Sequence, residues 1–256
     1  MIGYLDLEAY LGSEFIHPGA YETTEVLLHW LALQPGELAL DLGCGTGGTA
    51  VLAAGRTIGR VIALDRSPAM LAAAQARLRG AALSGRVHVM QSDANGALPF
   101  RAATFGAVYA ESVVALTEVE SVVGEGARIL RPGGRLALTE RIWKPGVTQS
   151  IVDEVNRRSQ RIFGIPAATR RPLDRDDWLR LLHQAGLVDV QAFAVDTLLP
   201  VQRSAPGQRQ RIVRWKKYLS RPPMIYHALR FKTLTRRYAA LFDHLESCLF
   251  LARKPE

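Results

Sequence analysis

The run Asp41-Leu42-Gly43-Cys44-Gly45-Thr46-Gly47-Gly48 decides the fold of this chain. It overlaps the end of a short apolar stretch at residues 38–42, which is typical of a buried strand, and it precedes a stretch with helical composition. The glycines let the backbone turn tightly and approach a ligand closely, because they adopt positive φ angles without a steric penalty. The sequence therefore predicts a strand, a ligand-binding turn and a helix, in that order.

Short apolar runs alternate with helical stretches throughout the chain beyond this turn. The alternation is typical of βαβ units, in which helices cover both faces of a mostly parallel sheet. We therefore expect an α/β, Rossmann-like fold in one domain. Strands are expected at residues 38–42, 60–64, 87–91, 107–110, 135–139, 188–199 and 248–252, and helices at 48–55, 67–79, 119–130 and 176–185.

Two stretches, residues 143–174 and 200–243, do not fit the alternation. Both follow strands whose carboxyl ends lie on the same side of the sheet, where open α/β sheets bind their ligands. We therefore expect helical caps on the substrate side. Residues 37–140 are expected to form the cofactor-binding core, and residues 1–36 an N-terminal helical lid, within a single domain over residues 1–256.

The composition, with 48% hydrophobic and 22% charged residues, is that of an ordinary globular protein. Cys44 and Cys248 lack metal-ligand spacing, so neither a metal site nor a disulfide framework is expected. No run reaches the roughly 18 apolar residues that span a bilayer, and the N-terminus lacks the basic region of an export signal. A cytoplasmic location is expected.

The formal charge of +8 is distributed unevenly along the chain. Residues 1–140 carry 10 basic and 14 acidic side chains, whereas residues 141–256 carry 22 and 10. Residues 197–242 hold eleven basic side chains and no acidic one. This asymmetry indicates an anionic partner or surface for the second half.

Positions 43, 45 and 48 match the G-x-G-x-x-G pattern of dinucleotide-binding enzymes, so two cofactor classes compete for this turn. The carboxylate of Asp41 at the end of the strand would repel the pyrophosphate of a dinucleotide. S-adenosylmethionine has no phosphate and carries an ammonium and a sulfonium, so Asp41 favours this cofactor. Asp65, 18 residues after Gly47, ends the second strand, where it could accept both ribose hydroxyls of either cofactor.

Four ordered blocks of sequence resemble the class I S-adenosylmethionine-dependent methyltransferase superfamily. The blocks are Asp-Leu-Gly-Cys-Gly-Thr-Gly at 41–47, Asp-Arg-Ser-Pro-Ala-Met-Leu at 65–71, Ser-Asp-Ala at 92–94 and Leu-Arg-Pro-Gly-Gly-Arg-Leu at 130–136. The likeness is strongest to the small-molecule branch that includes the ubiquinone and menaquinone C-methyltransferases. It implies seven strands, the last of them antiparallel, with the cofactor across the ends of the first four.

The resemblance also implies roles for particular residues. Asp93 would accept the adenine amino group and the Ala94 amide would meet the ring. Arg66 would lie along the adenine, while Glu111 and Ser112 would border the methionine amino end. The remaining cofactor contacts implied by the resemblance come from the turn: Gly43, Cys44, Gly45, Thr46 and Gly47.

Strand four ends in Tyr-Ala-Glu-Ser at 109–112, without the Asn/Asp-Pro-Pro-Tyr/Phe run that holds a planar amide in adenine and glutamine methyltransferases. That departure disfavours those acceptors. Methyl transfer from a sulfonium is an in-line displacement that depends mainly on alignment, so few indispensable side chains are expected. The candidates are His17, as a general base, with Tyr21 and Glu140. The alternatives are that His17 only forms a hydrogen bond near a helix start, that Tyr21 packs, and that Glu140 is a solvated strand end.

Three interpretations of the basic insert stay open. It could be a lid over a carboxylate- or phosphate-bearing metabolite, an RNA-binding surface, or a contact with an acidic membrane that reaches a lipid-like acceptor. The lid is favoured, because no separate RNA-binding module is present and the first half is acidic. The expected substrate-binding residues are Arg141, Arg211, Arg214, Lys216 and Tyr218.

Overall fold

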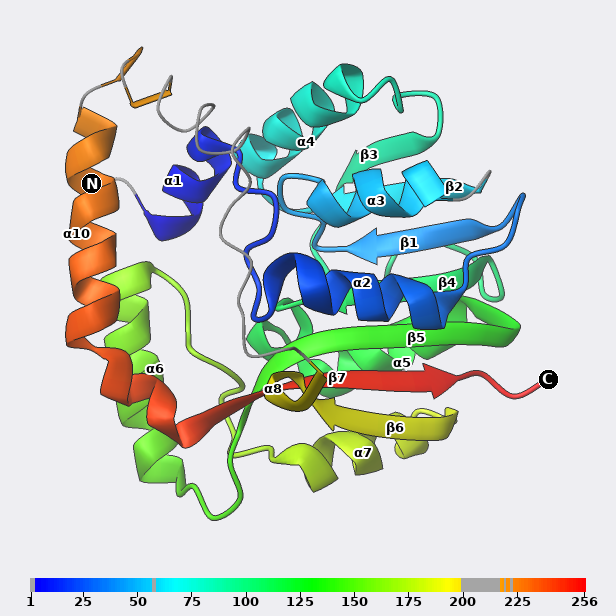
Figure 1. Ribbon diagram of the computed structural model, residues 1–256. Helices are drawn as coiled ribbons and strands as arrows, with labels where there is room; N and C mark the ends of the chain where they lie inside the picture. Colours follow the sequence, from blue (N-terminus) through cyan, green and yellow to red (C-terminus); the bar gives the residue numbers. More distant parts are fainter. Residues whose placement is uncertain (1–2, 57–58, 199–216, 219, 222) are drawn as a thin grey trace.

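Seven strands form one sheet in the order β3-β2-β1-β4-β5-β7-β6 (Figure 1). The structure is a computed structural model, and it describes residues 3–56, 59–198, 217–218, 220–221 and 223–256. The strands are β1 (Leu38–Leu42), β2 (Arg60–Asp65), β3 (Val87–Gln91), β4 (Phe105–Glu111), β5 (Leu130–Trp143), β6 (Val188–Ala194) and β7 (Leu245–Arg253). β7 runs antiparallel to both of its neighbours, and the other pairs are parallel. This confirms the expected sheet.

Helices cover both faces of the sheet. The helices are α1 (Tyr4–Leu11), α2 (Ala20–Leu31), α3 (Gly48–Arg56), α4 (Pro68–Gly80), α5 (Val119–Ile129), α6 (Gln149–Phe163), α7 (Arg175–Gln184), α8 (Val195–Leu198) and α10 (Pro223–Arg237), with 3-10 turns η1 (Val114–Leu116) and η2 (Ala239–His244). One apolar cluster joins α2, α3 and α4 to the sheet, and a second joins α5 and α7 to the opposite face. These clusters hold the carboxyl ends of the strands in a fixed arrangement.

Helix starts follow the capping residues that the sequence carries. Ser67 caps α4 by accepting a hydrogen bond from the Met70 amide at 3.3 Å, with Pro68 in the first turn. Asp174 caps α7 by accepting hydrogen bonds from the Asp176 and Asp177 amides. Because of this cap, α7 begins one residue earlier than its apolar spacing predicts.

Five strands differ from their expected bounds, β2 by a single residue. β4, β5 and β7 are longer than predicted, and β5 and β7 pair with each other as far as Trp143. The extended run expected over residues 188–199 is wrong in its second half. β6 ends at Ala194, where Val195 turns inward and becomes buried in α8.

The expectation of a lid over residues 1–36 is only partly met. Helix α2 places Leu27, Leu28 and Leu31 in the core beside the sheet, so it covers a face of the sheet as α3 does. Helix α1 lies instead beyond the carboxyl ends of the strands, next to α10, with α6 on the same side (Figure 1). Leu7, Leu11 and Phe231 pack together between α1 and α10. We call α1, α6, α10 and η2 the cap.

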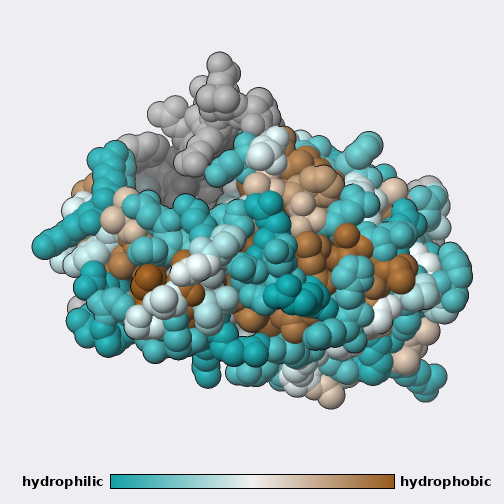
Figure 2. Space-filling view, turned by 90° about the horizontal axis from the view of Figure 1, so that it is seen from below, coloured by the Kyte–Doolittle hydropathy of each residue, from teal (hydrophilic) through white to brown (hydrophobic). Residues whose placement is uncertain are grey.

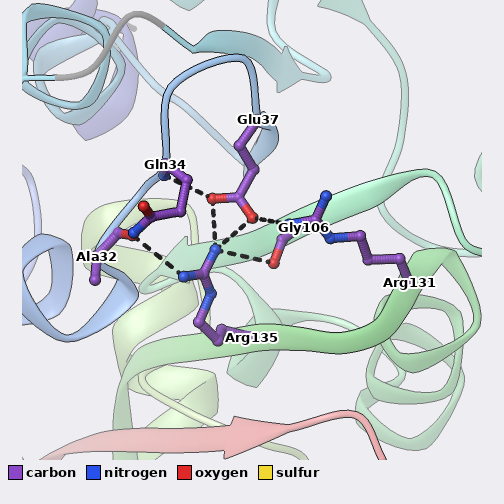
Figure 3. Close-up of polar contacts among 6 residues, drawn as sticks. All are labelled: Ala32, Gln34, Glu37, Gly106, Arg131 and Arg135. Carbon is purple, nitrogen blue, oxygen red and sulfur yellow. Dashed lines mark hydrogen bonds and ion pairs between the residues drawn. The ribbon is translucent and has the colours of Figure 1, made fainter. Parts of the chain in front are cut away.

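The amino end of the sheet is held by a buried ion cluster around Glu37 (Figure 3). The Glu37 carboxylate, 2% exposed, accepts hydrogen bonds from Arg135 at 2.5 Å and from Arg131 at 2.6 Å. Its other contact is the Gln34 amide at 2.9 Å. Gly106 lies so close that a Cβ there would stand 2.0 Å from Glu37 Oε1. This cluster lies at the opposite end of the sheet from the cap.

One edge of the sheet is formed by β6. Its side chains Val188 and Phe193 are 41% and 36% exposed. Figure 2 views the molecule from below Figure 1 and shows hydrophobic surface among hydrophilic residues on this side. The pairing of β6 with β7 shifts register between Val188 and Gln191. Such irregularities blunt an edge that could otherwise pair with another strand. No described helix is long and apolar enough to cross a membrane.

Candidate active site

Three carboxylates meet at the carboxyl ends of neighbouring parallel strands. Asp41 is the last residue but one of β1, Asp65 is the last residue of β2 and Glu111 is the last residue of β4. This is the place where the strand order reverses, since β2 and β4 lie on opposite sides of β1. Burial, reinforced by the charges of Glu111 and Asp65, raises the pKa of the Asp41 carboxyl well above its usual range.

The Asp41 carboxylate is built to meet a ligand. Its side chain is buried, the residue being 4% exposed, and Oδ2 has no hydrogen bond of normal length among the described residues. The buried Tyr109 hydroxyl is the described donor that acts on this carboxyl, and it lowers the pKa of Asp41 only in part against burial. A buried acceptor without a donor is costly, so a bound donor would stabilise it. An ammonium fits this position, and a diphosphate would face three carboxylates.

The glycine turn has the close approaches expected of it. Gly43 and Cys44 donate their amides to the Leu64 carbonyl at 2.7 and 2.8 Å, which ties the turn to β2. Gly43 has a φ of +75°, and a Cβ there would stand 2.3 Å from a methyl carbon of Val113. Position 43 therefore needs glycine for both conformation and space. Burial raises the pKa of the Cys44 thiol, which disfavours the thiolate form that a nucleophilic cysteine needs.

Asp65 lies where the sequence predicts, at the end of β2. Its Oδ2 accepts a hydrogen bond from the Gly45 amide at 2.9 Å, and its Oδ1 accepts one from the Ser67 amide at 2.8 Å. A carboxylate has about four lone-pair sites, so both oxygens can still accept a hydroxyl. The two amides thereby orient the carboxylate for the expected ribose contact.

The other residues expected to hold adenine lie on the neighbouring loops. Arg66 is exposed beside Asp65, and Asp93 and Ala94 follow β3. Asp93 Oδ1 accepts a hydrogen bond from the Asn95 amide at 2.9 Å, which closes a turn, and Ala94 is 7% exposed. Their contacts with adenine stay a prediction.

Glu111 lies in a polar network that sequence patterns do not reveal. The Thr24 hydroxyl donates to Oε1 at 2.8 Å and the Thr49 hydroxyl donates to Oε2 at 2.5 Å. His17 Nε2 lies 3.3 Å from Oε1, and its Nδ1 lies 3.2 Å from the Pro18 carbonyl oxygen. Both His17 and Glu111 side chains are at most 7% exposed. The structure thus joins His17 to the methionine end of the expected cofactor site.

Glu140 is fully buried and serves the backbone. Its carboxylate accepts hydrogen bonds from the amides of Val113, Val114 and Ala115, at 2.8 to 3.2 Å. The neighbouring Ser112 has a φ of +60°, a rare conformation for a residue with a Cβ, and its amide donates to the Thr139 carbonyl at 2.7 Å. The position of Glu140 supports a role in shaping the loop after β4, whereas direct contact with an acceptor is not supported.

Burial raises the pKa of Glu140 to about 7, against the opposing effect of the three amide hydrogen bonds. A carboxyl whose pKa is raised in the folded state destabilises the fold as it ionises, because its protonated form is favoured there. The unfolding free energy of the wild type should therefore fall, relative to that of Glu140→Gln, as the pH rises from about 4.5 to about 7. Denaturant titrations of both proteins across this range measure the difference; a constant difference would contradict the prediction.

Tyr21 does not point into this network. It is 43% exposed and packs edge-on against Phe15 with ring centroids 5.8 Å apart. A hydrogen bond to the Glu25 carboxylate raises the pKa of the Tyr21 hydroxyl. The structure therefore brings Glu111 together with His17, while Tyr21 lies to one side near Arg56.

The N-terminal segment crosses directly over the glycine turn. Thr46 donates its hydroxyl to the Ser13 carbonyl, and a Cβ on Gly48 would stand 2.2 Å from the Glu14 carbonyl oxygen. Arg77 on α4 fastens this segment, with hydrogen bonds to the Thr46 and Gly12 carbonyls and an ion pair with Glu14 at 2.7 Å. Sequence reasoning missed Arg77, since it resembles any other arginine of a solvated helix.

Replacing Arg77 by methionine should loosen the N-terminal segment over the glycine turn. Cofactor binding should weaken about tenfold, mainly through faster dissociation, because losing these charge-assisted hydrogen bonds removes on the order of 1.4 kcal/mol of binding free energy. Stopped-flow measurements of S-adenosylhomocysteine dissociation give the rate for each variant. Arg79→Met, at an exposed position of the same helix, is the matched control. Equal dissociation rates for the two variants would argue against this role of Arg77 in holding the N-terminal segment.

The expected substrate-binding residues are only partly described. Arg211, Arg214 and Lys216 lie outside the described residues. Tyr218 lies beside the cluster that joins α1 to α10. Arg141 is half-buried at the end of β5, and its guanidinium stacks 4.8 Å above the centre of the Phe242 ring. In the described part of the chain, no three His, Cys, Asp or Glu side chains are placed so that they could hold a metal ion together.

Comparisons with known proteins agree with this geometry. The family model described as "Methyltransferase domain" matches residues 40–138. The O-methyltransferase rstn1 of Aspergillus nomiae is 31% identical over 67% of this chain and 80% of its own length. The ubiquinone/menaquinone biosynthesis C-methyltransferase UbiE of Roseobacter denitrificans is 29% identical over 63% and 70%.

A solved structure, phosphoethanolamine N-methyltransferase 2 of Haemonchus contortus with bound S-adenosylmethionine, has the same fold. The TM-score is 0.70 at 19% identity, and the match covers 98% of this chain and 56% of that one. The sheet order, the acidic strand ends and the glycine turn define a class I S-adenosylmethionine-dependent methyltransferase. The chain belongs to the methyltransferase domain family, as the match over the cofactor core and the relative at 31% identity show.

Proposed function

We propose that this enzyme transfers a methyl group to a small anionic or aromatic metabolite by in-line displacement. The observation that carries the proposal is the cluster of aromatic rings in the cap. Tyr4 lies edge-on to Phe163 and Phe231, with ring centroids 5.9 and 5.5 Å away, and Phe163 lies 6.2 Å from Phe242. These four rings come from four different elements beyond the carboxyl ends of the strands, and the Arg141 guanidinium lies over one of them, the ring of Phe242.

S-adenosylmethionine supplies an electrophilic methyl group on a sulfonium. Asp41, Asp65 and Glu111 would hold the cofactor, because its positive charges and ribose hydroxyls match a carboxylate-lined floor. The segment latched by Arg77 would cover the site and exclude water. Alignment of this kind supplies on the order of 7 to 11 kcal/mol in favourable cases.

If the acceptor must lose a proton, His17 is the candidate base, and its Nε2 must first leave the Glu111 carboxylate, because both ring nitrogens face oxygen acceptors. It lies in the network of Glu111, where its Nε2 also stands 3.1 Å from the Thr24 hydroxyl. Tyr21 and Glu140 are left without a chemical role in this proposal, given their contacts. The two curated relatives are named for transfer to oxygen and to carbon, and both acceptor atoms are compatible with this site.

Calorimetric titration with S-adenosylmethionine, S-adenosylhomocysteine and NAD tests the cofactor half of the proposal. We expect binding of the first two and none of NAD. Methyl incorporation from labelled cofactor into a panel of phenols, aromatic acids, neutral aliphatic alcohols, RNA and anionic vesicles tests the acceptor half. Label in the aromatic or anionic small molecules supports the proposal, and label confined to RNA, vesicles or neutral alcohols contradicts it.

A further inference from the structure

Arg141 is a half-buried cation that lacks an anionic partner among the described residues. Its guanidinium lies over the face of the Phe242 ring and interacts electrostatically with Tyr4, and neither residue offers a carboxylate. Burial lowers the pKa of the Arg141 guanidinium. A guanidinium presents five donors in a planar fork that matches the two oxygens of a carboxylate or phosphate. Such a group, partly removed from water, gains strongly from a bound oxyanion.

The register of the sheet places Arg141 beside the methyl-transfer site. Glu111 pairs with Thr139 across β4 and β5. Arg141 follows two residues later on β5, so its side chain projects from the same face as that of Thr139. Two residues advance about 7 Å along a strand, and neighbouring strands lie about 4.8 Å apart. The backbone of Arg141 therefore lies within the length of one small molecule from that of Glu111. Its side chain leaves the sheet on the same face as Glu111, which contacts His17.

The neighbouring Glu140 keeps this arrangement in place. It projects to the opposite face, where it holds three amides of the loop after β4. Because side chains alternate between the two faces along β5, Glu140 points towards the loop after β4, whereas Arg141 points towards the cap. The adjoining strand β7 pairs with β5 without a break through this stretch, with Arg141 opposite Ser247.

We infer that Arg141 binds an oxyanion group of the methyl acceptor, whose apolar or aromatic body packs against the rings of Tyr4, Phe163 and Phe242. The inference rests on the proposed function and deepens it by assigning the acceptor class. The acceptor is a small molecule that carries a carboxylate or phosphate at one end and the methylated atom at the other. Arg141 then determines specificity, and it takes no part in the bond changes.

The test uses the full-length protein saturated with S-adenosylhomocysteine, and it uses benzoate, phenyl phosphate and the neutral isostere benzamide as probes. Isothermal titration gives each affinity. We expect benzoate or phenyl phosphate to bind at least tenfold more tightly than benzamide. Arg141→Met, which keeps the apolar stem, should remove this preference, whereas Arg141→Lys should keep part of it.

Arg180→Met is the matched control, because it removes the same charge from an exposed ion pair on α7. It should retain the full preference for the anions. The inference is overturned if benzoate, phenyl phosphate and benzamide bind equally well, or if none of them binds. It is also overturned if Arg141→Met keeps the preference of the wild type for the anions. Failure of S-adenosylhomocysteine itself to bind the wild type would instead refute the proposed function, so the two failures are distinguishable.

Discussion

Replacing Asp41 by asparagine should lower the affinity for S-adenosylmethionine at least about 30-fold while leaving the cofactor-free protein as stable as the wild type, or more stable. The affinity falls because truncating one side of a desolvated charge pair costs about 2 kcal/mol or more. The stability does not fall, since asparagine removes a buried charge that Glu111 and Asp65 repel. A loss of cofactor affinity without a loss of unfolding free energy distinguishes a ligand-binding carboxylate from a structural one.

The raised pKa of Asp41 gives this prediction a pH dependence. A group with a raised folded-state pKa destabilises the fold as it ionises, so the stability advantage of Asp41→Asn should grow as the pH rises from about 4 towards neutrality. Cofactor binding favours the ionised carboxylate, so the wild-type affinity should increase over the same range.

Calorimetry and thermal melts of both proteins, with and without cofactor, measure these effects. Asp189→Asn is the control, because Asp189 is an exposed acid on the far edge strand. Cofactor affinity equal to that of the wild type in Asp41→Asn would refute the assignment of the site.

Replacing Glu37 by glutamine should destabilise the fold by about 3 to 5 kcal/mol, because it leaves the buried guanidinium of Arg135 without its counter-charge. For a protein of this size, that loss lowers the melting temperature by roughly 6 to 20 °C. Cofactor affinity should change little, because the cluster lies at the amino end of the sheet. Loss of binding without loss of stability would contradict this separation.

A second substitution tests the physical reason. Arg135→Met combined with Glu37→Gln removes both buried charges, so much of the lost stability should return. Arg131 can turn to solvent, since its side chain is already 51% exposed. Glu25→Gln, which breaks an exposed pair with Arg56, should cost about 1 kcal/mol or less. Denaturant unfolding of the four proteins checks these values.

Much of the fold follows from local patterns. The glycine turn, the acid at the end of β2 and the capped start of α4 each depend on residues a few positions apart, so the chain specifies them directly. Strand bounds were less predictable. β5 extends to Trp143 because β7, about a hundred residues later, pairs with it throughout, and no local pattern contains that pairing.

The partners of the predicted site residues were not predictable in the same way. Thr24 and Thr49 meet Glu111 from helices 87 and 62 residues away in sequence. Arg77 fastens the N-terminal segment from a helix whose other arginine, Arg79, is exposed. Glu140 occupies a strand end that suggests contact with an acceptor, yet its carboxylate is taken up by three amides.

Short-range chemistry was enough to establish the class of fold and the cofactor. An acid, a glycine turn and a second acid at a set spacing must lie at adjacent strand ends once parallel pairing forms. Folding decided which of the remaining charges are used. Burial removes solvent and places distant side chains in contact. Asp41 Oδ2 is therefore left without a hydrogen bond of normal length, Glu140 is held by three amides, and the Arg141 guanidinium lies over the Phe242 ring without a carboxylate partner among the described residues.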